Sequence, residues 1–338
     1  MVPAAVEGAN VPDSAVPQET QTKHNVPPSF SVHYAGAFPP GDDVLGVIGF
    51  GAGKPAGLPP DCPFIQAPLT PVTGGPAFEI WRAASPVRRC RIGPVQGACS
   101  DDLAFGAVQL EDGVPLEDAA ERAYLSIFAF LAQTGFAQPI RFWNYLTAIL
   151  DDEQGMERYR RFNIGRHRAF LAQLRQAVPP AASGVGGHDG ASVIYFLAGR
   201  DAAQAIENPR QVSAYEYPPQ YGPRSPSFSR AGLFGGALFI SGTASIVGHE
   251  TRHGGDWRGQ LGETLENLRA LIVNAGQAAA LARAEDWGLK IYLRDPARQA
   301  DVEPALIAMF GAGSQRLYLR GEICRPDLLL EIEAFYGG

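Results

Sequence analysis

Short apolar runs separated by glycine and proline follow one another from about Phe30 onward, and they predict β-strands. In the first half of the chain the predicted strands are Val44–Phe50, Phe78–Trp81, Leu103–Leu110, Ile140–Leu150, Ser192–Ala198 and Gln211–Tyr217. The stretch from Pro179 to Gly190 is rich in turn-forming residues and predicts turns.

Two helices are predicted between these strands. Pro115 opens the first, whose apolar positions run from Leu116 to Leu131, and Gly135 ends it. The second is a basic segment that carries Arg158, Arg160, Arg161, Arg166 and Arg168.

The second half repeats this order of elements without repeating the sequence. Its predicted strands are Ala237–Ser241, Ala244–Gly248, Leu289–Arg294, Arg316–Ile323 and Leu328–Phe335, and its predicted helices are Trp257–Ala275 and Val302–Phe310. A shared order at similar spacing indicates two related α+β units, each a mostly antiparallel sheet with helices packed on one face.

The predicted division gives a proline-rich tail at residues 1–28, an N-terminal unit at 29–222 and a C-terminal unit at 223–338. The join falls in the proline-rich turn from Pro218 to Pro226.

Composition narrows the class of protein. The 338 residues are 46% hydrophobic and 19% charged, which excludes a wholly disordered chain. A net charge of −7 disfavours a general nucleic-acid binder. No basic segment precedes an apolar run at the N-terminus, and no run approaches the roughly 20 apolar residues that a membrane span needs. We therefore expect a cytoplasmic, reduced protein with neither nucleic acid nor membrane as a partner.

Three familiar motifs are excluded by their context. His249–His253 reads H-E-x-x-H, but glycines enclose it and a strand-like run precedes it, so a loop is favoured over the zinc-binding helix. Gly49–Lys54 resembles a phosphate loop, yet Ile48 and Pro55 occupy positions that this motif requires as Gly and Ser or Thr. Cys62, Cys90, Cys99 and Cys324 form no C-x-x-C pair, and no G-x-S-x-G elbow is present.

The C-terminal run from Glu322 to Glu333 is the most informative stretch. Strand alternation places Glu331 and Glu333 on one face and Leu330 and Ile332 on the other. If that face is covered, burial raises the pKa of a carboxyl and lets it donate a proton near neutral pH. The alternative is that one or both glutamates lie at a solvated sheet surface.

Two clusters of arginine and aromatic residues suggest an anion site. One is Tyr217–Arg224, a stiff turn with two tyrosines, and the other is Arg141–Tyr145, in which Arg141, Trp143 and Tyr145 share a strand face. Arginine binds a carboxylate through two parallel hydrogen bonds. Taken singly, each cluster also fits an aromatic packing corner with an exposed arginine.

The second half resembles the YjgF/RidA-like fold, through Gly255-Asp256, Gln260, Thr264–Leu268, Asn274–Gly276 and Leu330–Ala334. From about residue 30 onward the chain resembles the chorismatases. The matching stretches are Arg141–Tyr145 (RFWNY), Glu207–Pro209, Tyr221–Arg224 (YGPR), Leu238–Ala244 and Cys324–Glu331.

This resemblance implies an enzyme that releases pyruvate from chorismate without a metal or organic cofactor. It assigns Glu331 as the acid that protonates the enolpyruvyl methylene. It also implies that Arg141 and Arg224 bind the two substrate carboxylates, with Tyr145, Tyr217 and Tyr221 around them; Arg325 is a further candidate for a substrate carboxylate.

The resemblance also bears on the product. Aromatising members carry Gly at the place of Gly242 and Cys at the place of Cys324, which favours 3-hydroxybenzoate, with 4-hydroxybenzoate as a second product of some members. The hydrolytic members, which make a dihydroxycyclohexadiene carboxylate, more often have Ala in place of Gly242. Cys324 is either a participant or a small buried filler.

Three alternatives stay open at this stage: chorismate hydrolysis to the diol, a RidA-like imine or enamine hydrolase, and a metabolite-binding module without catalysis. The oligomeric state is either a monomer or a homotrimer.

Overall fold

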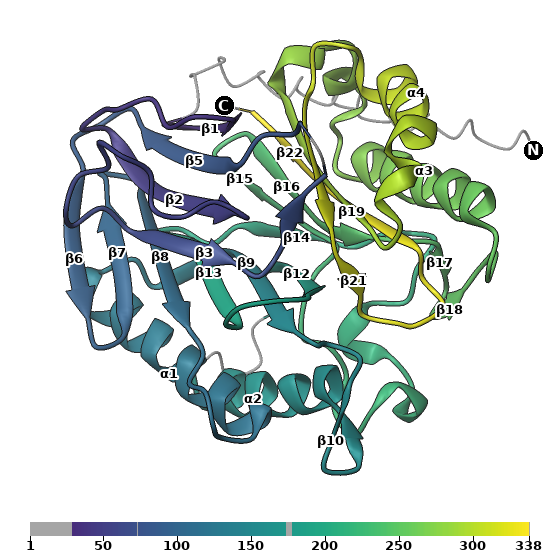
Figure 1. Ribbon diagram of the computed structural model, residues 1–338, viewed down its shortest axis with the longest axis horizontal. Coiled ribbons are helices and arrows are strands. Elements are labelled where there is room, and N and C mark those ends of the chain that lie inside the picture. Colours follow the sequence, from purple (N-terminus) through teal and green to yellow (C-terminus); the bar gives the residue numbers. More distant parts are fainter. Residues whose placement is uncertain (1–28, 73, 174–177, 338) are drawn as a thin grey trace, which may run out of the picture.

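Three larger β-sheets and four α-helices form one body in the computed structural model, which describes residues 29–72, 74–173 and 178–337 (Figure 1). The predicted tail at residues 1–28 lies outside the described residues. None of the described helices is long and apolar enough to cross a membrane.

The first seven-stranded sheet has the order β21-β12-β9-β13-β8-β7-β6. Its strands are β6 (Arg88–Ile92), β7 (Val95–Cys99), β8 (Leu103–Gln109), β9 (Gln138–Thr147), β12 (Ala181–Gly187), β13 (Val193–Gly199) and β21 (Glu322–Ile323). Helices α1 (Leu116–Thr134) and α2 (Arg158–Gln173) cover one face of it and share an apolar core with its strands. Gly135 ends α1 in the left-handed conformation, with φ 77°, which glycine adopts without strain.

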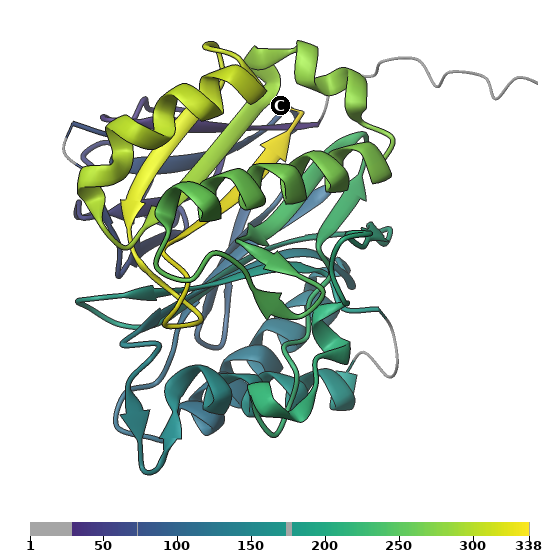
Figure 2. The ribbon, with the colours of Figure 1, turned by 90° about the vertical axis from the view of Figure 1, so that its right-hand side faces the viewer.

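The second seven-stranded sheet has the order β14-β15-β16-β22-β19-β20-β4. Its strands are β4 (Thr70–Pro71), β14 (Gln204–Ile206), β15 (Ala231–Phe234), β16 (Ala237–Thr243), β19 (Trp287–Leu293), β20 (Gln315–Arg320) and β22 (Leu330–Tyr336). Helices α3 (Trp257–Asn274) and α4 (Gln299–Phe310) cover its outer face (Figure 2). The two helical layers therefore lie on opposite sides of the molecule.

A four-stranded sheet of order β1-β5-β2-β3 closes the third side. Its strands are β1 (Phe30–Ala35), β2 (Val44–Phe50), β3 (Phe64–Ala67) and β5 (Phe78–Ala83). The uncovered faces of all three sheets meet in a common core, to which they contribute Trp81, Tyr195 and Phe239 among others. The remaining short elements are β10 (Asp152–Glu153), β11 (Met156–Glu157), β17 (Ile246–Val247), β18 (Glu250–Thr251), η1 (Ala214–Glu216), η2 (Pro219–Tyr221), η3 (Ala278–Ala282), η4 (Ala284–Asp286) and η5 (Pro296–Arg298).

The two larger sheets exchange strands across the predicted join. β21 leaves the second unit at Gly321 and pairs with β12 of the first sheet, whereas β4 and β14, from earlier in the chain, complete the second sheet. β12 and β16 then face one another, and the Ser241 hydroxyl accepts a hydrogen bond from the Ala182 amide at 2.9 Å. The division at residues 222/223 stays a proposal.

The predicted α+β class, with mostly antiparallel sheets and helices on one face of each large sheet, is confirmed. The prediction of turns throughout Pro179–Gly190 is wrong, because this stretch contains strand β12. Its glycines are needed for close approach: a Cβ on Gly187 would lie 2.0 Å from the Pro68 carbonyl oxygen, and one on Gly186 would lie 2.3 Å from Ile149 Cγ2.

The predicted strand Gln211–Tyr217 is also wrong. Only Gln211 makes a β-bridge, to Gly248, and the chain then turns into η1 through the bond from the Glu216 amide to the Ser213 carbonyl. Pro218 and Pro219 follow directly, and residues without an amide proton cannot continue a ladder.

Candidate active site

A cavity of about 370 Å³ lies where β12, β16 and β22 meet the start of α2 and the loops around Tyr221 and Arg325. Both large sheets contribute to its walls. The lining residues are Glu157, Tyr159, Arg160, Ala182, Ser183, Gly184, Tyr217, Gln220, Tyr221, Pro226, Phe228, Arg230, Gly242, Ala244, Ile246, Glu250, Thr251, Cys324, Arg325, Pro326, Asp327, Leu328 and Glu331.

Glu331 enters this cavity from β22. The apolar residues Leu330 and Ile332 pack under α3 and α4, so alternation turns Glu331 to the covered side, where it is 5% exposed. Within the described residues, its carboxyl has no hydrogen-bond or ion-pair partner. Burial, and second the charge of Glu333, raise the pKa of Glu331 to about 8, against the opposing effects of Arg141 and Arg230. The carboxyl is therefore protonated at neutral pH.

Gly242 makes room for that carboxyl. It lies in a bulge of β16 opposite β22, and a Cβ built on it would be 1.9 Å from Glu331 Oε1 and 2.6 Å from Glu331 Cδ. Its amide donates a hydrogen bond to Ser183 Oγ at 2.9 Å, which ties β16 to β12. A larger residue at this place would displace the acid.

Cys324 follows β21 directly and lines the same wall. Burial, with the Glu331 carboxyl as the second cause, raises the pKa of the Cys324 thiol to about 12. The sulfur is thus a neutral thiol at physiological pH and lacks the nucleophilicity of a thiolate.

Tyr217, Tyr221 and Arg325 form another part of the cavity wall. The Arg325 guanidinium stacks 4.1 Å from the centre of the Tyr221 ring and 5.2 Å from that of Tyr217. Arg325 Nη1 donates to the His249 carbonyl at 2.9 Å, and the Tyr221 hydroxyl donates to the same oxygen at 2.6 Å. The arginine is held in place by stacking and hydrogen bonding, with no carboxylate partner among the described residues.

Arg230 is the buried cation of the cavity, with an exposed fraction of 4%. Its Nη2 donates to the Tyr217 hydroxyl at 2.7 Å and to the Val212 carbonyl at 2.9 Å. The sequence reasoning missed it, because Arg230 stands in a loop without a motif and reaches the cavity only when that loop folds beside β16. Arg160 and Ser183 were missed as well: the first belonged to an undifferentiated basic helix, and the second to the stretch predicted as turns.

The predicted residues divide into two groups. Glu331, Cys324, Gly242, Tyr217 and Tyr221 are brought together around the cavity, and Arg325 joins them.

Arg141, Tyr145 and Arg224 do not line it. Arg141 is 1% exposed and pairs with Glu333 at 3.0 Å, and the Tyr145 hydroxyl bonds that of Tyr292 at 2.9 Å inside the core. Arg224 is exposed. The expectation that Arg141 and Arg224 bind the substrate carboxylates, with Tyr145 beside them, does not fit these positions: Arg141 and Tyr145 have internal partners, and Arg224 is exposed.

The excluded motifs behave as expected. Gly49–Lys54 leaves β2 in a turn, and His249–His253 falls in the β17–β18 hairpin region rather than in a helix. His249 Nδ1 lies 3.1 Å from the Tyr221 hydroxyl, whereas His253 Nε2 lies 3.4 Å from Glu263 Oε2. In the part of the chain that the structure describes, no group of three His, Cys, Asp or Glu side chains is arranged to hold a metal ion.

Comparisons with known proteins agree with this geometry. Residues 79–198 match the family described as chorismatase FkbO/Hyg5-like, N-terminal. The chain is 34% identical to a 3-hydroxybenzoate synthase of Streptomyces hygroscopicus, over 87% of this chain and 92% of that protein. It is also 34% identical to a chorismatase of Streptomyces rapamycinicus, with the same coverage. A chorismatase crystal structure covers 91% of this chain with 32% identity and a TM-score of 0.82, and 98% of that structure is matched.

Proposed function

The chain belongs to the chorismatase family, and from that premise we propose that it converts chorismate to pyruvate and 3-hydroxybenzoate. The observation that carries the proposal is the protonated carboxyl of Glu331, which has no partner among the described residues and lies in a cavity that also contains three arginines. An enol ether is a weak base at carbon, so its cleavage requires a positioned neutral acid.

In the proposed first step, Glu331 gives its proton to the methylene carbon of the enolpyruvyl group. The electron pair of the carbon–carbon double bond forms the new C–H bond, and the positive charge appears on the ether carbon and oxygen as an oxocarbenium ion. Glu331 becomes a carboxylate. Cleavage of the bond between the ring and the ether oxygen then completes pyruvate.

Formation of hydroxybenzoate divides the atoms of chorismate between two products without adding water. Because the ether oxygen leaves in pyruvate, 3-hydroxybenzoate forms only if the oxygen of the neighbouring ring hydroxyl moves to the carbon that the ether oxygen leaves. In the proposed step this oxygen bonds to that carbon as the ring–ether bond breaks, and the newly formed Glu331 carboxylate takes the hydroxyl proton, so the acid returns to its starting state. The resulting epoxide opens at its other carbon, and transfer of the ring proton to the oxygen completes the aromatic ring. Hydrolysis to the diol would add one water molecule instead. The buried position of Glu331 supports the aromatising route, because a site that excludes water disfavours the competing addition.

The two carboxylates of chorismate have matching cations in the cavity. Arg230 lies deep, near enough to Glu331 to influence its charge, and is suited to the enolpyruvyl carboxylate. Arg325 and Arg160 lie farther along the wall and are suited to the ring carboxylate. Holding the substrate at both ends places the methylene against the acid, which lowers the barrier through orientation.

The decisive experiment incubates the chelator-treated protein with chorismate, follows pyruvate in a coupled assay and separates the other products by chromatography. Pyruvate with 3-hydroxybenzoate is the expected outcome. Pyruvate with the diol would contradict the aromatising assignment, and no pyruvate above the spontaneous background would contradict the function.

Glu331→Gln tests the assigned acid in the same assay. The amide keeps the shape of the side chain but has no acidic proton, so turnover is expected to fall by about 10²- to 10⁴-fold while chorismate still binds. Isothermal titration of chorismate measures that binding. Glu266→Gln, the same change on the exposed side of α3, is the matched control and keeps full turnover. Undiminished turnover in Glu331→Gln would remove Glu331 from the mechanism.

A further inference from the structure

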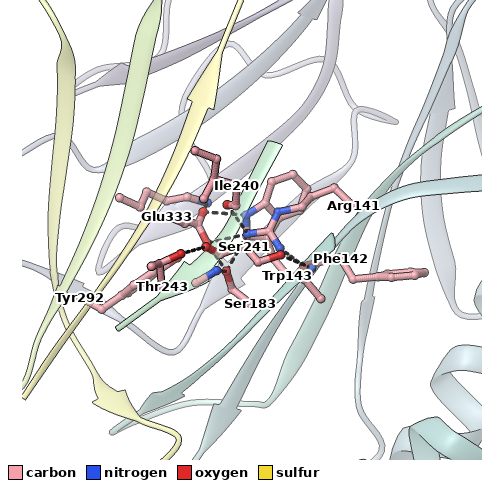
Figure 3. Close-up of polar contacts among 12 residues, drawn as sticks. Arg141, Phe142, Trp143, Ser183, Ile240, Ser241, Thr243, Tyr292 and Glu333 are labelled. Atoms are coloured by element: carbon pink, nitrogen blue, oxygen red, sulfur yellow. Dashed lines mark hydrogen bonds and ion pairs between the residues drawn. The ribbon is translucent and has the colours of Figure 1, made fainter. Parts of the chain in front are cut away.

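Glu333 stands two residues after Glu331 on the same face of β22, and its surroundings are different (Figure 3). Its carboxylate receives four donors: Lys290 Nζ at 2.7 Å, Trp143 Nε1 at 2.7 Å, Arg141 Nη2 at 3.0 Å and the Ser183 hydroxyl at 2.5 Å. Although burial alone would raise the pKa of Glu333, Lys290 and Arg141 lower it. Glu333 is therefore a fixed anion.

The charges around Glu333 already balance. Lys290 also pairs with Glu79 at 2.7 Å, so the cations of Lys290 and Arg141 face the anions of Glu79 and Glu333. We call these four residues the ionic cluster. A charge on Glu331 would be a third anion beside a cluster that is already neutral, in a region where water does not screen it.

Ser183 completes the arrangement from the cavity wall. Its oxygen accepts hydrogen bonds from Arg141 Nη2 at 2.6 Å and from the Gly242 amide at 2.9 Å, so its single proton goes to Glu333. A hydroxyl has one donor and two acceptor positions, and all three are used. Ser183 thus lies beside the Gly242 bulge, yet it has no hydrogen left to stabilise a charged Glu331.

We propose that Glu333 is a positioning residue for the reaction proposed above: its fixed negative charge, anchored by Lys290 and Arg141 and by the Ser183 hydroxyl, keeps the neighbouring Glu331 carboxyl in its proton-donating form. This inference rests on the proposed function only for its catalytic meaning. The electrostatic effect itself is a property of the free protein.

Other groups also act on Glu331. The titratable and charged side chains that line the cavity with Glu331 are Arg160, Arg230, Arg325, Glu157, Glu250, Asp327, Tyr159, Tyr217, Tyr221 and Cys324. Arg141 acts on its charge from the ionic cluster, and Tyr292 stands opposite Glu331 in β19. Arg141 and Arg230 favour the charged form and oppose Glu333. Chorismate brings carboxylates to the cavity arginines, which reduces their influence, so substrate binding strengthens the retention of the proton.

The sign of the pH effect follows. Turnover requires protonated Glu331, so the rate of the bound complex is high below its pKa and falls as the pH rises through that value. Removing the Glu333 charge lowers the pKa of Glu331, and the alkaline limb moves to lower pH. A like charge on a neighbouring side chain of the same buried strand face shifts the pKa of a carboxyl by roughly one unit or more.

The test is a carbon-13 NMR titration of glutamate side-chain carboxyls in the free wild-type protein, with Glu331→Gln used to assign the Glu331 signal. We expect Glu331 to titrate near pH 8 in the wild type. In Glu333→Gln it titrates at lower pH, by roughly one unit. Glu333→Asp keeps the charge and is expected to keep the Glu331 pKa near its wild-type value. The alkaline limb of the pH profile of pyruvate formation should move to lower pH in Glu333→Gln and stay near its wild-type position in Glu333→Asp.

Equal Glu331 titration in wild type and Glu333→Gln would overturn the proposal, as would equal shifts in Glu333→Gln and Glu333→Asp, which indicate a structural role alone. If Glu333→Gln does not fold, the wild type decides: a Glu331 signal that titrates near 4.5, the ordinary value, overturns it. None of these titrations contains chorismate, so failure of the proposed function remains distinguishable from failure of this inference.

Discussion

The cavity and the ionic cluster are two polar regions supplied by the same strand, and they treat a glutamate in opposite ways. Glu333 receives four donors and is ionised, whereas Glu331, two residues earlier, receives none among the described residues and is neutral at pH 7. Both carboxyls are buried to the same degree, at 4% and 5% exposure. Burial alone therefore does not set the protonation state. The charges next to each carboxyl decide it: Lys290 and Arg141 beside Glu333, and the Glu333 anion beside Glu331.

The two regions also differ in what they contribute: the ionic cluster serves the stability of the fold, and the cavity serves the reaction. In the ionic cluster each charge is compensated, so the cluster is compatible with folding. In the cavity the arginines and the acid are left with unused hydrogen-bonding capacity, which a substrate with two carboxylates can satisfy. The substitutions below act on one region at a time and are ordered by the size of the expected effect.

Lys290→Met removes one cation from the ionic cluster and leaves Glu79 uncompensated in the core. The free energy of unfolding is expected to fall by about 3–5 kcal/mol, because an unpaired buried charge is left behind. Urea denaturation at pH 7 measures this change. Lys54→Met, at an exposed site, is the matched control with a change within about 0.5 kcal/mol.

Adding Glu79→Gln to Lys290→Met restores the balance, since Glu333 keeps Arg141. The double variant should therefore be more stable than Lys290→Met alone. If Lys290→Met is as stable as the wild type, compensation of charge does not stabilise the ionic cluster. The proposed difference between the cluster and the cavity would then be wrong.

Gly242→Ala acts on the cavity instead. The added Cβ would overlap the Glu331 carboxyl, the movable end of a side chain, so the acid shifts while the fold survives. Turnover is expected to fall by about 10- to 100-fold, because small misplacements of a reacting group cost about that much. The pyruvate assay and thermal unfolding measure the two effects separately.

Gly232→Ala is the control for this change: it is also a buried strand glycine, and its added Cβ would meet only ordinary contacts, the nearest at 3.5 Å. Full turnover in Gly242→Ala would mean that the position of the Glu331 carboxyl is not limiting.

Local pattern predicted much of this architecture. Helices α1 and α3 were predicted with starts within about a residue of those observed, because the spacing of apolar residues marks them and a glycine follows each. The alternation in β22 placed both glutamates on one face. Burial of that face was left open, since it depends on the sheet that contains β12. That strand consists largely of Gly and Ala, which read as turns, although close packing is what excludes larger residues there.

The arginines show the same limit. Arg141 looked like a ligand because it shares a strand face with Trp143 and Tyr145, and its partner Glu333 lies 192 positions away in the sequence. Arg230 looked unremarkable because the loop that carries it has no pattern of its own. Pairing across such separations is set by the tertiary fold, so one sequence does not distinguish an arginine held for substrate from one committed to an internal carboxylate.

Cys324→Ala is expected to have the smallest effect. Its thiol is neutral at physiological pH, since burial and the nearby Glu331 raise its pKa to about 12, so it supplies neither a nucleophile nor a base. Pyruvate formation should stay within roughly threefold of wild type, as for loss of a small buried filler. Initial rates of pyruvate formation measure this. The control is Cys62→Ala, because Cys62 is buried in a separate apolar cluster and does not line the cavity.

The product ratio is where Cys324 should matter. Replacing the sulfur by hydrogen enlarges the cavity beside Glu331. Water that enters this space competes with aromatisation for the oxocarbenium ion. The diol fraction is therefore expected to rise while the pyruvate rate barely changes. A fall in the pyruvate rate by more than about a hundredfold would instead place the thiol in the proton-transfer step. The cavity would then contain two proton donors, Glu331 and Cys324, and the charge of Glu333 alone would not explain how the proton is held.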